Sequence, residues 1–313
     1  MSETQSGTPA SAWALLGVAL LAVSSAGVVL QQMGDVPPLL RASWRMQGTA
    51  LVLLPGFVYQ FWLNERPRVE REDILVLVAS SAFLAIHFGS WVWSLDNTSL
   101  VHSLLFVNTH PLVLVALMPL MGRAVSRGHV MGVLIGFVGA AVTLLEIGGE
   151  GPVTPEGDAA AFLGAATVVG YLLAGRHLRS ERGMPIFVYA FPVTLGAGIW
   201  LSISSFALES TALSSIPPES SLMGWTDLFW LPWVAYLSFG PGLCGHTGIN
   251  TVLRWISPII VSIVLLMEPV IGGLIGWILT DESFIGPFTI VGGSLMIAGA
   301  IMVTLEENEE HHG

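Results

Sequence analysis

Residues 268–272 read Glu-Pro-Val-Ile-Gly, and residues 110–114 read His-Pro-Leu-Val-Leu. A polar residue, a proline and an apolar run therefore occur once in each half of the chain. Three further pairs of small residues keep the same order, with one slip of two residues: Ser99 with Ser257, Gly132 with Gly292, and Gly139 with Gly299. An ordered match of this kind indicates an internal repeat.

The composition indicates a protein that lies in a lipid bilayer. Of the 313 residues, 53% are hydrophobic and 11% are charged, whereas a water-soluble domain carries about 25% charged residues. A membrane span takes about 20 apolar residues, and ten such segments alternate with short polar turns. They are residues 12–32, 38–63, 74–95, 99–121, 129–147, 158–176, 186–206, 228–250, 257–280 and 286–304. The predicted fold class is an all-α membrane protein with ten transmembrane helices.

The repeat unit contains five spans, and this odd number has a topological consequence. The second unit must enter the membrane with the opposite polarity, so the two halves are predicted to be inverted repeats. We expect the first repeat over residues 1–147, an external linker over 148–157, the second repeat over 158–304 and an acidic cytoplasmic tail over 305–313. Inverted repeats are typical of transporters, whose substrate site lies near the middle of the membrane between the halves.

The basic residues predict the orientation of the chain, because arginine and lysine near span ends are retained in the cytoplasm. All eleven basic residues are arginine. Nine of them follow the second, fourth, sixth and eighth spans: Arg66, Arg68, Arg71, Arg123, Arg127, Arg176, Arg179, Arg182 and Arg254. Both termini are therefore expected in the cytoplasm, with the protein in the plasma or inner membrane. Arg41 and Arg45, at the outer start of the second span, do not fit this pattern.

Charge, cysteine content and motifs argue against several function classes. The 22 acidic residues against 11 basic ones give a net charge of −11, which disfavours nucleic acid as a partner. The single cysteine, Cys244, forms no internal disulfide, and neither a metal site nor a cofactor is expected. The sequence lacks Gly-x-Ser-x-Gly and His-Glu-x-x-His motifs, so an intramembrane enzyme is a weaker hypothesis.

Four groups of motifs, taken in order, resemble the drug/metabolite transporter superfamily, in particular its ten-span EamA-type carriers. They are Pro37-Pro38 leading to Arg45, His87-Phe88-Gly89-Ser90-Trp91, Gly245-His246-Thr247-Gly248, and Met267-Glu268-Pro269-Val270 with Gly272-Gly273. One departure is that Arg123 follows Gly122, where the family usually has Gly-Glu.

The resemblance implies a secondary transporter that moves a small organic metabolite by alternating access, commonly outward. Amino acids and their analogues are the leading substrate class by analogy with the family. A passive channel or facilitator is the alternative function. A homodimer is compatible with the sequence.

His87 and His246 are candidate substrate-binding residues, because the repeat alignment places them one residue apart in the equivalent third and eighth spans. On a helical period of 3.6, His87 shares a face with Trp91 and His246 shares one with Asn250. Aromatic surface with a few convergent polar groups suits a small amphipathic metabolite. The alternative is that both histidines only fasten neighbouring helices by hydrogen bonds.

Arg45 is a further candidate, because its position matches the family's arginine and a guanidinium binds a carboxylate in a bidentate manner. The alternative for Arg45 is snorkelling to the lipid headgroups. Snorkelling is the expectation for Arg41.

Glu268 is the candidate proton carrier, because an ionisable side chain in the middle of a span costs about 2.5–3.5 kcal/mol and therefore indicates a function. His110 occupies the repeat-equivalent position, so the two residues can form a proton relay for antiport. Structural alternatives stay open: Glu268 caps a backbone group freed by Pro269, and His110 bonds to a backbone carbonyl.

Gly240, Pro241 and Gly242 form a candidate gating hinge. Together with Gly245 and Gly248 they place four glycines and a proline within nine residues, a composition that does not make a regular helix. Interrupted spans near the midplane mark binding sites in transporters. A hinge without ligand contact fits the same residues.

Overall fold

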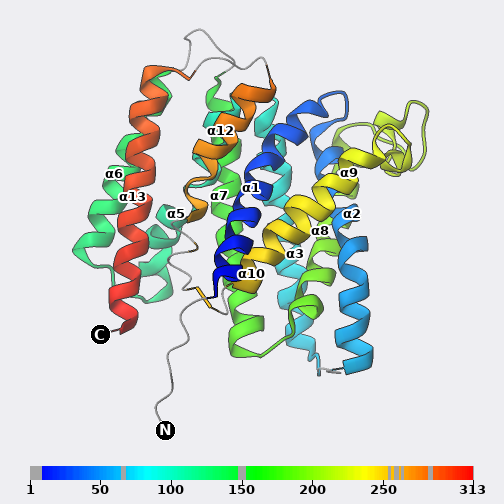
Figure 1. Ribbon diagram of the computed structural model, residues 1–313, viewed down its shortest axis with the longest axis horizontal. Coiled ribbons are helices and arrows are strands. Elements are labelled where there is room, and N and C mark those ends of the chain that lie inside the picture. Colours follow the sequence, from blue (N-terminus) through cyan, green and yellow to red (C-terminus); the bar gives the residue numbers. More distant parts are fainter. Residues whose placement is uncertain are drawn as a thin grey trace.

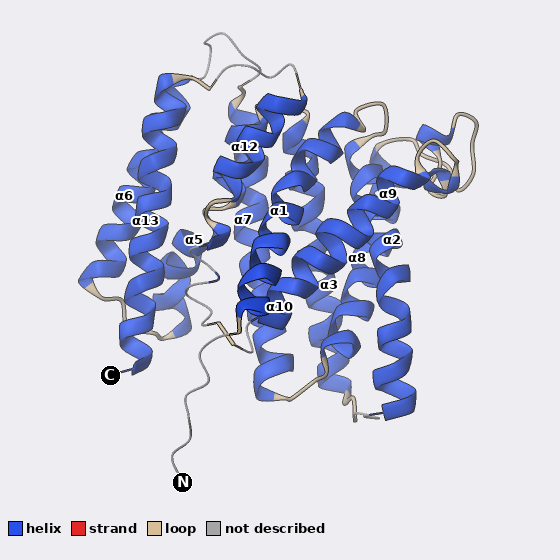
Figure 2. Cartoon of the chain, in the orientation of Figure 1, coloured by secondary structure: helices blue, strands red, loops and turns tan. Residues whose placement is uncertain are grey.

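The computed structural model describes residues 9–64, 68–146, 153–252, 255–256, 261, 264–280 and 285–312. These residues form helices joined by turns (Figures 1 and 2). Within the described ranges the β-structure is limited to an isolated bridge between Ala212 and Ser221. The all-helical fold agrees with the sequence prediction.

The first half of the chain carries six α-helices. They are α1 (Ala10–Gln32), α2 (Pro38–Val58), α3 (Arg71–Leu95), α4 (Leu100–Val107), α5 (His110–Leu117) and α6 (Arg127–Thr143). A π-helical turn (Tyr59–Asn64) extends α2, and a 3-10 turn (Met118–Met121) extends α5.

The second half carries the remaining described helices. They are α7 (Pro155–Arg176) with the π-helical turn η4 (His177–Glu181), α8 (Ile186–Leu208), α9 (Leu231–Leu237), the π-helical segment η7 (Ser238–Thr247), α10 (Gly248–Val252), α12 (Glu268–Leu279) and α13 (Pro287–His312). Two short 3-10 turns, Pro218–Ser220 and Gly224–Thr226, lie in the connection from α8 to α9.

Six helical stretches in the described part of the chain are long and apolar enough to cross a membrane. They are Ala10–Gln32, Arg71–Leu95, Leu100–Met121, Pro155–Arg179, Ile186–Leu208 and Pro287–Glu306. Two shorter apolar helices, Arg127–Thr143 and Glu268–Leu279, add to them. Each of the ten predicted segments contains helix, but crossing of the membrane by all ten stays a prediction.

The predicted fourth and ninth spans are interrupted, which the sequence analysis did not foresee. α4 ends at Val107 and α5 starts at His110, with Pro111 in its first turn. In the same way a turn precedes Glu268, and α12 starts there with Pro269 in its first turn. Proline suits the first turn of a helix, because the amide proton that it lacks has no intrahelical partner there. Pro269 therefore starts a helix and does not free a carbonyl inside one.

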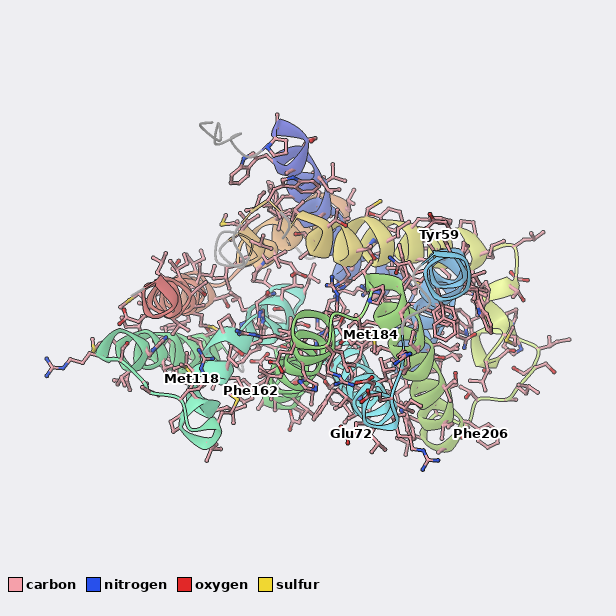
Figure 3. The ribbon with its side chains drawn as sticks, turned by 90° about the horizontal axis from the view of Figure 1, so that it is seen from below. Tyr59, Glu72, Met118, Phe162, Met184 and Phe206 are labelled. Atoms are coloured by element: carbon pink, nitrogen blue, oxygen red, sulfur yellow. The ribbon has the colours of Figure 1, made fainter. Side chains whose placement is uncertain are left out.

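The helices pack in a definite set of pairs. α6 packs on α13, α2 on α8, and α3 on both α7 and α8, while α1 packs on η7 and α12. The α6–α13 pair lies at one side of the bundle, away from α2 and α8, both in Figure 1 and in the view from below (Figure 3). α1, α7 and α12 lie between these two groups in Figure 1.

Glycines bring α6 and α13 into close contact. A Cβ atom added to Gly132 would lie 2.8 Å from the carbonyl oxygen of Gly299, and one added to Gly139 would lie 2.6 Å from that of Gly292. The four glycines that align in the sequence repeat therefore meet in space, but with exchanged partners: Gly132 meets Gly299 and Gly139 meets Gly292.

Glu209 fixes the start of α2, the helix that carries Arg45. The backbone N–H groups of Leu39 and Leu40 donate to the two carboxylate oxygens of Glu209, at 2.7 and 3.0 Å. A carboxylate is favourable at a helix N-terminus, where amides lack intrahelical partners and the helix dipole is positive. Because Glu209 directly follows α8, this cap also ties α2 to α8.

Candidate functional site

A cavity lies among α2, α3, α7, α8 and η7, and it encloses about 670 Å³ of empty space with its open mouth included. Among the described residues its lining includes Arg45, Thr49, Leu53, Leu84, His87, Phe88, Val168, Tyr171, Ile186, Tyr189, Thr194, Gly242, His246 and Thr247. Small-molecule sites in proteins have a mainly apolar lining with a few polar groups. The lining of this cavity has that character.

Arg45 is the charged group of the cavity lining. Its side chain is 1% exposed, and its Nη2 lies 3.5 Å from Nε2 of His246. The guanidinium carbon lies 4.4 Å from the centroid of the Phe88 ring and 5.7 Å from that of Trp91. Nε and Nη1 have no hydrogen-bond partner among the described residues. Arg45 therefore lies inside the bundle, and its charge is incompletely paired.

The two candidate histidines, His87 and His246, line the same cavity. Nδ1 of His87 lies 2.8 Å from the carbonyl oxygen of Gly164 on α7, so this histidine does fasten two helices while it lines the cavity. Its ring stacks on Trp91 at 6.4 Å, and the ring of His246 meets Phe88 edge-on at 6.2 Å. The structure thus brings four predicted residues together around Phe88.

The side chain of Asn250, the fifth predicted residue of this group, lies outside the described residues. The hinge candidates belong to η7, whose π-helical form agrees with the predicted irregularity. A Cβ atom added to Gly242 would lie 2.8 Å from Oγ1 of Thr49. Gly242 thus allows η7 to approach α2 next to the cavity, and the gating role stays a prediction.

The sequence analysis missed Tyr171 and Tyr189, which line the cavity on α7 and α8. The Tyr189 hydroxyl is 2.8 Å from Oγ of Ser80 on α3, and the two tyrosine rings are 6.1 Å apart. Neither residue belongs to a repeated motif or to a charged group. No feature of the sequence therefore distinguished them from the tyrosines that anchor spans at membrane interfaces.

Glu268 lies at the start of α12, beside the break between α4 and α5. Its carboxylate is hydrogen-bonded to the side chain of Asn108 and interacts electrostatically with Arg45. His110 instead bonds to the backbone of Val107, as its structural alternative expected. These contacts pair each residue with another partner, and the His110–Glu268 relay stays a prediction.

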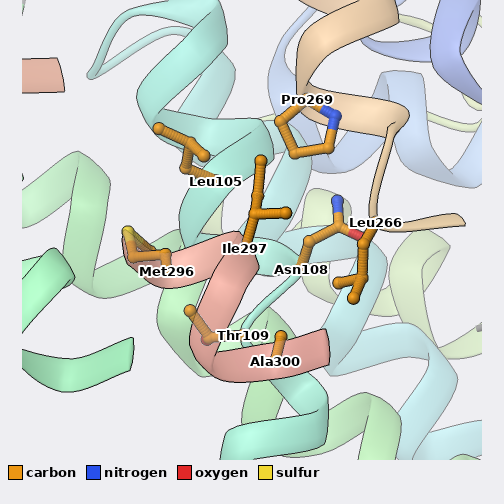
Figure 4. Close-up of a pocket in the computed structure, with 8 residues that line it drawn as sticks. All are labelled: Leu105, Asn108, Thr109, Leu266, Pro269, Met296, Ile297 and Ala300. Atoms are coloured by element: carbon orange, nitrogen blue, oxygen red, sulfur yellow. The ribbon is translucent and has the colours of Figure 1, made fainter. Parts of the chain in front are cut away.

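A second, smaller pocket of about 230 Å³ lies at this break, with Asn108, Thr109, Leu266 and Pro269 in its lining (Figure 4). Side chains of α13, among them Ile297, complete its wall in the figure. The pocket lies beside both interrupted spans, where the ends of helices meet.

The position of Arg41 differs from the one predicted from the sequence. Its side chain is fully buried, its Nη1 donates to the carbonyl oxygen of Leu30 at 2.6 Å, and its Nη2 pairs with the carboxylate of Asp96 at the end of α3. The snorkelling prediction for Arg41 is wrong, because an internal carboxylate supplies the counter-charge.

A buried polar cluster joins α4, α7 and α13, and the sequence analysis missed it. Nδ1 of His102 lies 3.0 Å from the carboxylate of Asp158, and Nε2 lies 2.8 Å from the hydroxyl of Thr289. Thr98 donates to the other oxygen of Asp158 at 2.7 Å. Asp158 is 1% exposed, whereas Glu268 is only partly buried. Asp158 is therefore more deeply buried than Glu268, the acid that the sequence analysis singled out.

The described residues contain no group of three or more histidine, cysteine, aspartate or glutamate side chains that could hold a metal ion.

Comparisons with known proteins agree with this architecture. Residues 10–145 match the EamA-like transporter family, which confirms the resemblance to the drug/metabolite transporter superfamily. A solved crystal structure, whose title gives no function, superposes with a TM-score of 0.62 over 96% of this chain and 98% of that chain, at 19% identity. At this identity the likeness shows the fold alone. No curated protein matches the sequence.

Proposed function

We propose that this chain, which belongs to the EamA-like transporter family through its residues 10–145, is a secondary transporter. It exports a small organic metabolite, an amino acid or an analogue, across the plasma or inner membrane by alternating access. The cavity beside Arg45 is the substrate site in this proposal, with His87 and His246 in its lining and Trp91 next to Arg45. Asn250 stays a predicted member of this group.

The observation that carries the proposal is the state of Arg45. A charged group inside a membrane protein is costly unless it is paired, and two nitrogens of this buried guanidinium have no partner among the described residues. Its place in the lining of the cavity supports a role in binding an anionic substrate group. Arg41, by contrast, pairs with Asp96 and donates to the carbonyl oxygen of Leu30, and of its nitrogens Nε alone has no partner among the described residues.

The pairing of helices supports the inverted repeat. In the proposed repeat, α1 corresponds to α7, α2 to α8, α3 to η7, and α4–α5 to α12. Each contact between helices then has a symmetric counterpart. The α3–α7 contact corresponds to the η7–α1 contact, and the α4–α7 contact corresponds to the α12–α1 contact. The α2–α8 and α6–α13 contacts map onto themselves. A twofold axis in the membrane plane accounts for all of these pairs.

The arrangement of the chain ends supports the proposed orientation. α1 begins and α13 ends on the lower side in Figure 1, and α7 ends on that side too. η4, which continues α7, and the residues after it carry Arg179 and Arg182. By the positive-inside rule, these arginines support a cytoplasmic location for this side.

The test is solute counterflow in proteoliposomes that contain the purified protein, with a panel of labelled amino acids and carboxylates. A carrier loaded with unlabelled substrate accumulates the labelled form transiently, whereas a passive channel only equilibrates it. Accumulation for at least one compound supports the proposal. Equilibration without overshoot for every permeant compound supports the channel, and a chemically altered compound supports an enzyme.

A homodimer remains compatible with this proposal. Large apolar side chains of α6 and α13 are exposed, among them Leu134 and Ile290. Lipid covers such a face as well as a second copy does, so the oligomeric state is to be measured by crosslinking in membranes.

A further inference from the structure

We infer that the transported substrate is a monocarboxylate with an apolar or aromatic body and no ammonium group. The inference rests on the proposed transport function and narrows its substrate class. It selects the carboxylate analogues of amino acids over the amino acids themselves. Three observations lead to it: a surplus of donors, the charge of the lining, and the apolar end of the cavity.

The first observation is a surplus of hydrogen-bond donors around Phe88. Nε and Nη1 of Arg45 and Nε1 of Trp91 are buried, and none of these three atoms has an acceptor among the described residues. All three can only donate, and each buried donor without an acceptor costs free energy. The Arg45 guanidinium lies within 5.7 Å of the Trp91 ring. Arg45 lines the cavity, and a carboxylate bound there supplies two oxygens with several acceptor sites for the unpartnered nitrogens of Arg45.

The second observation is the charge of the cavity lining. Arg45 is positive, and no aspartate or glutamate is found among the described lining residues. Glu268 interacts with Arg45 but lies outside that lining and already bonds to Asn108. An ammonium group would therefore enter a site with net positive charge and without a carboxylate of its own. Burial of an unpaired charge beside a like charge is strongly unfavourable.

The two histidines do not change the positive charge balance of the cavity lining. Because a carbonyl oxygen only accepts, Nδ1 of His87 donates to Gly164, and the neutral ring offers at most one uncharged acceptor to the cavity. Protonation of His87 or His246 would add positive charge. Neither state supplies the counter-charge that an ammonium group needs.

The third observation is the character of the rest of the cavity. Leu53, Leu84, Ile186 and the rings of Tyr171 and Tyr189 line it. The Tyr189 hydroxyl is already bonded to Ser80. This part of the site therefore offers mainly apolar and aromatic surface, which suits the body of an amphipathic acid.

The test compares three probes that share one phenyl body: 3-phenylpropionate, phenylalanine and 2-phenylethylamine. Their affinities for the purified full-length protein are measured by equilibrium dialysis at neutral pH. We expect 3-phenylpropionate to bind at least about tenfold more tightly than phenylalanine, with 2-phenylethylamine weakest. Arg45→Gln should weaken 3-phenylpropionate at least about tenfold, and Arg45→Lys should weaken it less. Arg68→Gln, at an exposed arginine, is the matched control and should bind as wild type does.

The inference is overturned if phenylalanine binds as tightly as 3-phenylpropionate, if the amine binds best, or if none of the three probes binds. The wild-type ranking decides this even if an Arg45 variant folds poorly. Counterflow of phenylalanine or of the amine would then still support the transport function. If no compound of the counterflow panel accumulates, the result instead contradicts the proposed transport function itself.

Discussion

The guanidinium carbon of Arg45 lies 4.4 Å from the centroid of the Phe88 ring. This contact joins α2 to α3 at the cavity wall and offsets part of the cost of a buried positive charge, since cation–π contacts contribute about 0.5–2 kcal/mol. It does not supply acceptors for Nε and Nη1. Arg45 is thus held in place, but two of its nitrogens have no acceptor among the described residues, as expected for a group that binds an anionic ligand.

Replacement of Arg45 by methionine should stabilise the protein while it removes transport. An apolar side chain of similar length keeps the packing and removes the buried charge, and comparable replacements have stabilised proteins by about 1–4 kcal/mol. Thermal unfolding in detergent measures the change, with Arg41→Met as the matched variant. Arg41→Met should destabilise, because it leaves Asp96 without its partner. A loss of stability in Arg45→Met as large as that in Arg41→Met would indicate a structural role for Arg45.

Glu268→Gln should make transport independent of an imposed pH gradient while substrate binding is retained. Glutamine keeps the hydrogen bond to Asn108 and removes the exchangeable proton, so only the coupling is altered. Counterflow and gradient-driven flux in proteoliposomes measure the two properties separately. Glu72→Gln, at an exposed acid in the first turn of α3, is the control. If the Glu268→Gln variant keeps gradient-driven flux at the wild-type rate, the proposed role of Glu268 as a proton carrier is contradicted.

The repeat explains how much of this site could be predicted. The residues that align between the halves, His110 with Glu268 and the glycines of α6 with those of α13, do lie at helix starts or helix contacts. Sequence patterns repeat where backbone geometry repeats, so these positions could be predicted from the sequence. The helix interruptions before His110 and Glu268 could not be predicted, because a proline inside a helix and one in its first turn look alike in a sequence.

The partners of polar side chains on distant helices could not be predicted from the sequence for another reason. Arg41 meets Asp96 and His102 meets Asp158 across many residues of chain, and only the packed helices bring these groups together. Tyr171 and Tyr189 lie on different spans without a shared motif. A lone polar residue in one helix does not indicate which residue of another helix it faces.

Gly132→Ala should destabilise the α6–α13 pair by about 1–3 kcal/mol, because its Cβ would lie 2.8 Å from a backbone oxygen and the helices would have to separate. Gly17→Ala is the matched control, since a Cβ atom there meets no other atom within 4 Å. That variant should be neutral or slightly stabilising. Thermal unfolding of both variants in the same detergent gives the comparison. Equal melting temperatures would mean that the close contact is absent in solution.

Asp158→Ala should lower stability by about 1–3 kcal/mol, because it leaves the buried His102 ring and the Thr98 hydroxyl without their carboxylate partner. The His102→Ala/Asp158→Ala double variant should lose less than the sum of the single losses, which a double-mutant cycle measures. Glu181→Ala breaks the exposed His177–Glu181 pair and should cost less than about 1 kcal/mol. Additive losses at His102 and Asp158 would contradict the pairing.

Counterflow of labelled 3-phenylpropionate in proteoliposomes tests the central claim most directly, with wild type, Arg45→Gln and Arg68→Gln compared at equal protein content. The account predicts transient accumulation above equilibrium for wild type and Arg68→Gln, and none for Arg45→Gln. Undiminished accumulation in Arg45→Gln would contradict the claim that Arg45 anchors the transported molecule in the cavity.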